Sequence, residues 1–390
     1  MTVAYPISRA WVSAGGTGAQ NYDEFADDAE ITAIISANPV SALGVEMPHR
    51  APESLGKSFT ESLPDAAARL TAAKDQGRYT AAEEIVAVYR LGKGSFGVFC
   101  LVDTSQISTN ADEPGLVIRN EDVFIEKVRE RVALAEAVGH LLSPVLLLQT
   151  GKGAELHALL SELTERLGDA DVADTDQAGR EHAIWVLGPG ADRDAVLALA
   201  GGGELIVADG NHRSLAAQTG HLPKFLAVVT TPESIAIQPY NRLVSGVELD
   251  LAALGGELVE LDGRPEVPTA GGTIHVYQGG KGYALRLPVA ADASVLDRLD
   301  HALVEKQVFN QALGLDAGDK KINYVGGDYP ASWLCDEVDA GRASLAILIA
   351  PVTVDDFVAV NLSRLKLPRK STWFTPKARG GLVLSELPRA

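Results

Sequence analysis

Cysteine is scarce in this sequence: the 390 residues include only Cys100 and Cys335. Two cysteines are too few for a disulfide framework, and their spacing is not that of a metal site. Both lie in apolar segments, so we expect buried thiols and a reducing compartment. The cytoplasm is therefore the expected location.

Long apolar runs are also missing. The longest, residues 344–352 and 145–148, are far shorter than the roughly 20 residues that a membrane-spanning helix needs. The first 16 residues lack the basic start and the continuous apolar stretch of a secretory signal. We expect no membrane-embedded segment.

Basic residues are few relative to acidic ones, 34 against 52, which gives a net charge of -18. The mean surface field therefore repels polyanions, and a nucleic-acid partner is disfavoured. A small phosphate site is still compatible with this charge, because a few cations and backbone N–H groups can reverse the field within a pocket.

The composition is otherwise that of an ordinary globular protein, with 46% hydrophobic and 22% charged residues. A chain of this length exceeds one hydrophobic core, so we expect two or three units. The pattern predicts an accessory region over 1–84, a core domain over 85–235 and a β-rich α+β domain over 236–390.

Apolar periodicity predicts a mixed α/β fold. Short helices and loops are expected to about residue 80, and then a hairpin formed by β-rich runs 85–90 and 96–102 around a turn at 92–95. Further helices are expected over 66–74, 121–142, 156–167, 214–218 and 295–309, and strands over 144–148, 183–187, 204–208 and 226–229.

The hairpin turn matches the glycine-rich loop of protein kinases, reading Gly92-Lys-Gly-Ser-Phe-Gly-Val98. No His-Arg-Asp or Asp-Phe-Gly motif follows it. Because such a motif counts only in its context, we favour a plain hairpin turn.

The strongest chemical signal is the segment Asp209-Gly210-Asn211-His212-Arg213, with Ser214 next, which joins a strand to a helix. Gly210 can turn tightly, and the start of a helix presents free N–H groups that bind anions. Arg213 can grip a phosphate, His212 can donate a proton, and Asp209 can bind a metal or orient a hydroxyl. The alternative is that Asp209 or Asn211 caps the helix and Arg213 is solvated.

A second polar cluster lies near the C-terminus, in the basic stretch 366–377 of an otherwise acidic chain. Hydroxyls beside lysines can hold a phosphate or a carboxylate, which makes Lys370, Ser371, Thr372 and Lys377 candidate substrate-binding residues. An edge strand protected by lysines explains the pattern equally well.

Two weaker signals complete the candidate site. Glu121, at the start of a charged helix, is either a general base or a carboxylate that complements the helix dipole. Asn241 and Arg242 form a polar pair after Pro239 and Tyr240, and they are candidate substrate-binding residues.

Taken in order, these segments resemble a family of ParB-like proteins of unknown function, DUF1015, related to archaeal free-serine kinases of the ParB/sulfiredoxin superfamily. The resemblance covers most of the chain and implies a ParB/sulfiredoxin-like core with a mixed sheet over 85–235. The matching segments are residues 21–24, 38–39, 89–90, 120–121, 205–213, 240–242 and 370–377.

The resemblance implies a nucleotide-dependent phosphotransferase that acts on the hydroxyl of a small free amino acid, with L-serine as the leading substrate. It places Glu121 as the base, with ATP or ADP as donor and Mg²⁺ implied by the chemistry; no ligand set for the metal can be read. This sequence has Asn120 and Asn211 where the family pattern shows histidines, so a hydrogen-bonding group is kept and a titratable group is lost.

Two other functions stay open. One is a non-catalytic ParB-like regulator that binds nucleotide, and the other is a sulfiredoxin-like reductase, which would need a reactive cysteine near Arg213. The sequence does not determine the phosphate donor, the amino acid that accepts the phosphate, or whether identical copies of the chain associate.

Overall fold

The structure is a computed structural model that describes residues 3–20, 25, 28–108, 115–121, 123, 125–176 and 179–388. It divides into two units, Met1–Ile235 with Pro376–Ala390 (unit 1) and Ala236–Thr375 (unit 2). The last residues of the chain thus belong to unit 1, whereas the sequence-based division grouped them with the C-terminal domain. The resemblance segment 21–24 lies outside the described residues.

Unit 1 is built on a mixed sheet that has thirteen strands within the described residues. The order is β5-β6-β11-β8-β12-β4-β3-β2-β21-β7, with β1 beside β4, β10 beside β3 and β9 beside β10. The strands are β1 Ala4–Tyr5, β2 Ile7–Ser13, β3 Tyr79–Leu91, β4 Ser95–Asp103, β5 Ile107–Ser108, β6 Val117–Ile118, β7 His140–Leu141, β8 Val145–Gln149, β9 Val172–Thr175, β10 Glu181–Leu187, β11 Leu205–Asp209, β12 Lys224–Thr230 and β21 Val383–Glu386.

Strands β3 and β4 form the expected hairpin, with Tyr89 opposite Gly97. Gly92 and Gly94 in its turn have φ of +60° and +83°, which glycine adopts without steric cost. The kinase-like glycine pattern is therefore accounted for by a tight turn between two buried strands.

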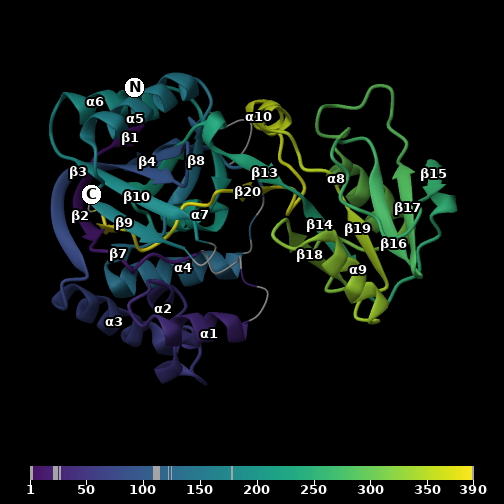
Figure 1. The fold of residues 1–390 in the computed structure, drawn as a ribbon, viewed down its shortest axis with the longest axis horizontal. Coiled ribbons are helices and arrows are strands. Elements are labelled where there is room, and N and C mark those ends of the chain that lie inside the picture. Colours follow the sequence, from purple (N-terminus) through teal and green to yellow (C-terminus); the bar gives the residue numbers. More distant parts are fainter. Residues whose placement is uncertain are drawn as a thin grey trace. The chain divides into compact units, whose positions relative to one another are not determined.

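Helices cover both faces of the unit 1 sheet, α5 and α6 on one side and α3 and α4 on the other (Figure 1). Leu156, Leu160 and Leu163 lie on one face of α5 and are fully buried against β4 and its neighbours. On the opposite side, Leu70 of α3 packs with Leu134 of α4. The helices of unit 1 are α1 Asp28–Ala37, α2 Leu43–Glu46, α3 Leu63–Asp75, α4 Ile125–Val138, α5 Gly153–Leu167, α6 Ala191–Ala200 and α7 Asn211–Thr219.

The prediction of only helices and loops before residue 80 is wrong for β2. This strand pairs with β3 on one side and with β21, from the other end of the chain, on the other side. Its sequence does not alternate cleanly between buried and exposed positions. Because long-range pairing defines the strand, no local pattern reveals it.

Unit 2 contains an antiparallel sheet of order β15-β17-β16-β19-β14-β18. Alternate residues of β19 face two cores: Leu345 and Ile347 pack on a helical segment formed by α8 and a π-helix, and Ala346 and Leu348 pack on α9. The elements are β13 Ala236–Gln238, β14 Tyr240–Val244, β15 Glu257–Glu260, β16 Ile274–Gln278, β17 Lys281–Arg286, α8 Asp300–Leu303, the π-helix Val304–Leu313, β18 Ile322–Gly326, α9 Ala331–Asp339, β19 Leu345–Leu348, α10 Val354–Leu362 and β20 Trp373–Thr375, which pairs with β13.

The predicted mixed α/β class is confirmed by this arrangement of sheets and helices. The expected helix over 121–142 is found as α4, and the one over 295–309 as α8 with the π-helix. None of the helices formed by described residues has the length and hydropathy to cross a membrane.

Candidate active site

The strand-turn-helix segment lies where two parallel strands end. Strand β6 pairs in parallel with β11, with Ile118 opposite Ile206. Parallel strands finish at the same edge of a sheet, so the residues after Ile118 and the turn after β11 lie next to each other. Helix α7 begins at Asn211, two residues after β11 ends, and Figure 1 shows its place in unit 1.

A buried hydrogen bond between two amides joins these segments. Asn211 Nδ2 donates to Asn120 Oδ1 over 2.5 Å, and the two residues are 4% and 2% exposed. Glu121, half-buried, follows Asn120 directly, and consecutive Cα atoms are about 3.8 Å apart. The two asparagines therefore hold Glu121 beside the turn. Asn211 Oδ1 has no hydrogen-bond partner in the described part of the chain.

The turn itself depends on Gly210, whose φ of +96° and ψ of +31° lie in the left-handed region. A Cβ on this residue would lie 2.8 Å from Arg213 Nε. The glycine thus permits both the turn and the close approach of the Arg213 side chain. Arg213 Nη2 donates to Asp209 Oδ2 over 2.6 Å, which holds the guanidinium at the start of α7.

Lys377 reaches the same turn from the end of the chain. Its Nζ lies 4.0 Å from Asp209 Oδ1, and the Lys377 and Asp209 side chains are 10% and 18% exposed. The N-cap residue of α7 is Gly210, which has no side chain to cap the helix, and the first N–H groups of a helix have no partner within the helix itself. Two cations thus approach one carboxylate beside a helix N-terminus, and this local excess of positive charge favours an anion.

His212 and Ser214 occupy the first turn of α7. His212 is half-buried. Ser214 is fully buried, and its hydroxyl donates to the carbonyl of Asn211 over 2.9 Å. Through this hydrogen bond, Ser214 stabilises the start of α7.

Asn241 and Arg242 lie in unit 2, on strand β14, and are 0% and 2% exposed. Asn241 Oδ1 accepts from the Ile349 backbone N–H, and Arg242 Nη1 donates to the carbonyls of Tyr240 and Asn241. The Arg242 guanidinium also stacks 4.4 Å from the Tyr324 ring centroid. Burial lowers the pKa of Arg242 to about 10, with the neighbouring tyrosines and Glu305 opposing it.

Lys370, Ser371 and Thr372 also belong to unit 2 and precede strand β20. Lys370 has a φ of +58°, and its Nζ lies 5.6 Å from the centroid of the Tyr240 ring. The Ser371 hydroxyl donates to the Pro368 carbonyl over 2.6 Å. Thr372 is half-buried. Their role in binding a substrate stays a prediction.

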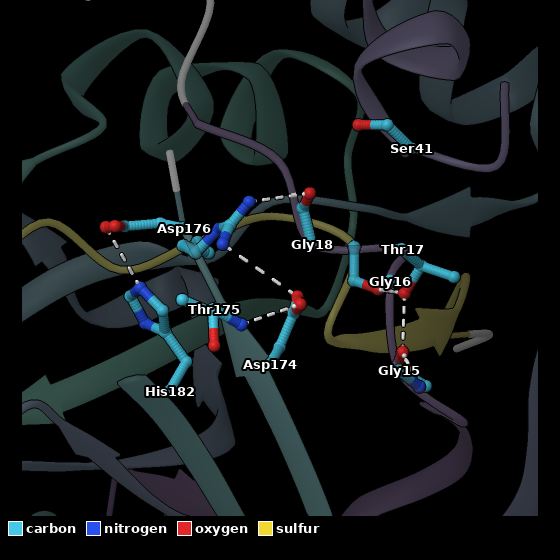
Figure 2. Close-up of polar contacts among 12 residues, drawn as sticks. Gly15, Gly16, Thr17, Gly18, Ser41, Asp174, Thr175, Asp176 and His182 are labelled. Atoms are coloured by element: carbon cyan, nitrogen blue, oxygen red, sulfur yellow. Dashed lines mark hydrogen bonds and ion pairs between the residues drawn. The ribbon is translucent and has the colours of Figure 1, made fainter. Parts of the chain in front are cut away.

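Sequence reasoning missed a buried polar network around Arg379 in unit 1. Tyr89 Oη lies 2.7 Å from His182 Nδ1, and His182 Nε2 lies 3.2 Å from Asp176 Oδ2 (Figure 2). Burial lowers the pKa of His182, which the hydrogen bond to Asp176 opposes and the charge of Arg379 reinforces. Lys377 and Arg379 are two cations, one residue apart, in a segment otherwise rich in small residues. This spacing was the one local feature of the sequence that could have indicated the network.

Both cysteines are fully buried. Burial raises the pKa of Cys100 to about 12 and that of Cys335 to about 11. A nucleophilic thiolate needs exposure and a lowered pKa, so the structure disfavours a sulfiredoxin-like reaction at either residue.

The carboxylates of the described residues do not gather into a metal site. Among the described residues, no group of three or more His, Cys, Asp or Glu side chains could hold a metal ion. Mg²⁺ in phosphoryl-transfer enzymes takes one or two carboxylates and completes its shell with phosphate oxygens and water. Asp209 fits such a requirement, because it is the carboxylate at the turn.

The fold and site define a mixed α/β protein with a polar strand-turn-helix site at a sheet edge. The chain belongs to the family described as Protein of unknown function (DUF1015), whose model matches residues 13–302. Membership in the ParB/sulfiredoxin superfamily stays a prediction. None of the curated proteins matches the chain.

The solved structures that are similar to this chain include the following three. A mutant free serine kinase in complex with ADP is 12% identical, with 71% of this chain and 87% of that chain covered and a TM-score of 0.40. A conserved hypothetical protein from Pyrococcus furiosus is 12% identical, with 72% and 93% covered and a TM-score of 0.37. The protein SbnI with C-terminal truncation, from Staphylococcus aureus, is 14% identical, with 71% and 82% covered and a TM-score of 0.37.

Proposed function

We propose that this protein is a nucleotide-dependent phosphotransferase acting on the hydroxyl of a small free amino acid, with L-serine as the leading acceptor and O-phosphoserine as product. One observation carries the proposal: the hydrogen bond between Asn120 and Asn211 holds Glu121 beside the turn at which Arg213 and Lys377 converge on Asp209. A base and a phosphate cradle thus lie at one sheet edge of unit 1.

The reaction assigns a separate task to each group. Glu121 takes the proton from the acceptor hydroxyl as its oxygen bonds to the terminal phosphorus of ATP or ADP. The bond from that phosphorus to the leaving nucleotide oxygen breaks, which releases ADP or AMP. Arg213, Lys377 and the first N–H groups of α7 offset the charge on the phosphate oxygens.

The donors at the turn fit a polyphosphate. A guanidinium and an ammonium both hold phosphate oxygens by charge-assisted hydrogen bonds. Asp209 would be a protein ligand of Mg²⁺, which would supply positive charge to offset that of the phosphate groups. His212 in the first turn of α7 would supply a further hydrogen bond to phosphate.

The test is a transfer assay followed by phosphorus NMR. Purified protein is incubated with Mg²⁺, with ATP or ADP, and with a panel of free amino acids. We expect an O-phospho amino acid signal with serine and one of the two nucleotides. Failure of every pairing to consume nucleotide would sink the phosphotransferase proposal.

Glu121→Gln tests the base. It should reduce turnover by about 10²–10⁴-fold, the usual contribution of a positioned base, and leave nucleotide affinity within about twofold. The matched control is Glu130→Gln, an exposed glutamate on α4, which should keep wild-type turnover. Equal rates for Glu121→Gln and wild type would remove Glu121 from the mechanism.

A second candidate is a non-catalytic regulator that binds nucleotide at the same turn. The observation in its favour is that Asn120 and Asn211 replace two titratable side chains of the family pattern with amides. If calorimetry detects nucleotide binding and the transfer assay detects no consumption of nucleotide, the protein is a regulator.

A further inference from the structure

A lysine and a histidine meet beside the last strand in the order of the unit 1 sheet. Lys74 lies in the last turn of α3, and His140 begins β7. Lys74 Nζ lies 2.5 Å from His140 Nε2, and both residues are half-buried. Because 66 residues of chain separate them, only folding brings this pair together.

The Val138 carbonyl fixes which nitrogen of His140 carries the proton. Its oxygen lies 2.7 Å from His140 Nδ1. A carbonyl oxygen can only accept, so Nδ1 is protonated and the neutral ring turns its lone pair at Nε2 toward Lys74. Lys74 therefore donates a hydrogen bond to a nitrogen that can take a proton from it.

Strands β2 and β21 supply the rest of the surroundings. Lys74 Nζ lies 3.9 Å from the centroid of the Trp11 ring. Glu386 is opposite His140 in the pairing of β21 with β7. The Glu386 carboxylate accepts from Trp11 Nε1 over 3.2 Å and pairs with Arg9 Nε at 3.2 Å. Both of its oxygens thus have other partners, which limits their hold on the Lys74 ammonium.

Burial makes the Lys74 ammonium easier to deprotonate than that of an ordinary lysine. It lowers the pKa of Lys74 from 10.5 to about 8, and the charge of Glu386 opposes this. Burial also lowers the pKa of His140; the Val138 hydrogen bond opposes this, Lys74 reinforces it and Glu386 opposes it. At pH 8, roughly half of the Lys74 side chains therefore carry an uncharged, nucleophilic amine.

The three groups have the arrangement that activates a nucleophilic side chain. A nucleophile lies within hydrogen-bond reach of a base, and a third group orients that base. Here Lys74 is the nucleophile, His140 the base and the Val138 carbonyl the orienting group. A lysine that only packed on Trp11 would need no base, so the histidine is the observation that points to a reaction.

We propose that Lys74 is a modification site at which a small acyl phosphate transfers its acyl group to the lysine amine, with His140 as the base. The Lys74 nitrogen bonds to the acyl carbon. The bond from that carbon to the phosphate oxygen breaks, which releases inorganic phosphate. The nitrogen gives its proton to His140 Nε2, which passes it to water. The product is an amide without charge.

An acyl phosphate suits this pair for two reasons. It carries its own leaving group, so the reaction needs no residue beyond the nucleophile and the base. It is also small, and a half-buried amine admits a small reagent more readily than the large carrier of an acyl thioester.

Acetyl phosphate is the probe. The purified full chain is incubated with it, and peptide mapping by mass spectrometry gives the acetylation rate of each lysine. We expect Lys74 to react at least about tenfold faster than Lys93, an exposed lysine in the turn between β3 and β4, because a positioned base assists only Lys74. Equal rates would overturn the proposal. The assay contains no nucleotide, so its outcome does not depend on the proposed phosphotransferase reaction.

His140→Gln tests the base, because glutamine keeps a hydrogen-bond acceptor for Lys74 and loses the titratable ring. Acetylation of Lys74 should slow at least about tenfold while that of Lys93 stays the same. The matched control is His275→Gln in unit 2, whose ring also has Nδ1 near a backbone carbonyl, 2.6 Å from that of Glu266. It should keep the wild-type rate at Lys74. An unchanged rate in His140→Gln would remove His140 from the reaction and contradict the proposal.

The pH profile of the wild type is a measurement that needs no variant. The acetylation rate of Lys74 should rise with pH and level off above about pH 8, where the amine is largely uncharged. A lysine with only a structural contact to Trp11 would react faster up to about pH 10. A rate that keeps rising to that pH would therefore exclude an activated Lys74.

Discussion

At the scale of single residues, the pair Asn120 and Asn211 connects two segments that are far apart in the sequence. Each side chain offers one carbonyl oxygen and one amide, and the bond between them leaves Asn211 Oδ1 without a hydrogen bond to any residue in the described ranges. A histidine at either position would titrate near neutral pH, whereas an amide does not. The two asparagines therefore cannot carry a proton transfer at this site.

A double-mutant cycle measures this connection. Asn211→Ala leaves the buried Asn120 oxygen without its donor, so the free energy of unfolding should fall by about 1–3 kcal/mol. Asn120→Ala should cost a similar amount, and the double variant should cost less than the sum of the two by about 0.5–3 kcal/mol. Urea unfolding of the three variants gives these values. Strict additivity would show that the amides act independently.

At the scale of elements, the β11 turn with α7 was predictable and the strand pairs around it were not. Three local features identify the turn: an apolar run that precedes Asp209, the glycine at position 210, and the helical pattern that follows it. Strand β2 depends on two ends of the sequence that meet only in the folded sheet. No pattern within one window of sequence contains that information.

The same limit applies to the predicted site. The order of motifs predicted that Glu121 and the 209–213 turn would act together, and the parallel pairing of β6 with β11 gives a physical reason for their proximity. Asn241 and Ser371 had suitable side-chain chemistry, but both prove to be buried and hydrogen-bonded to backbone groups. Burial is set by tertiary packing, which residue type alone does not report.

Gly210→Ala tests the turn as an element. The left-handed conformation should cost about 1–2 kcal/mol of stability, and the new Cβ should push Arg213 away from Asp209, which weakens nucleotide binding. Gly139→Ala is the matched control, because Gly139 has a φ of +68° and open space around its missing Cβ. It should lose comparable stability and keep nucleotide affinity. Calorimetric titration with ADP, combined with thermal unfolding, separates the two effects. Equal nucleotide affinity in both variants would show that Gly210 has only a conformational role.

At the scale of the whole molecule, the two units have separate cores. Unit 1 buries its sheet between two helical layers, and unit 2 buries both faces of its own sheet. His301 lies in the core of unit 2 and is 2% exposed. Burial lowers its pKa from 6.5 to about 3, the charge of Arg242 adds to this, and a hydrogen bond to the Tyr240 backbone opposes it.

This lowered pKa predicts that acid destabilises unit 2. Below pH 6.5 the unfolded chain binds a proton at His301 that the folded unit does not bind until about pH 3, so stability falls as the pH decreases. Between pH 7 and pH 5 the loss should be about 2 kcal/mol, because one pKa unit corresponds to about 1.4 kcal/mol. Hydrogen exchange of the β16 and β19 amides, corrected for intrinsic rates, measures it. His301→Gln should remove this part of the pH dependence and leave the β4 and β12 amides of unit 1 unchanged. Identical pH dependence in the variant and the wild type would show that His301 does not titrate on unfolding as its burial requires.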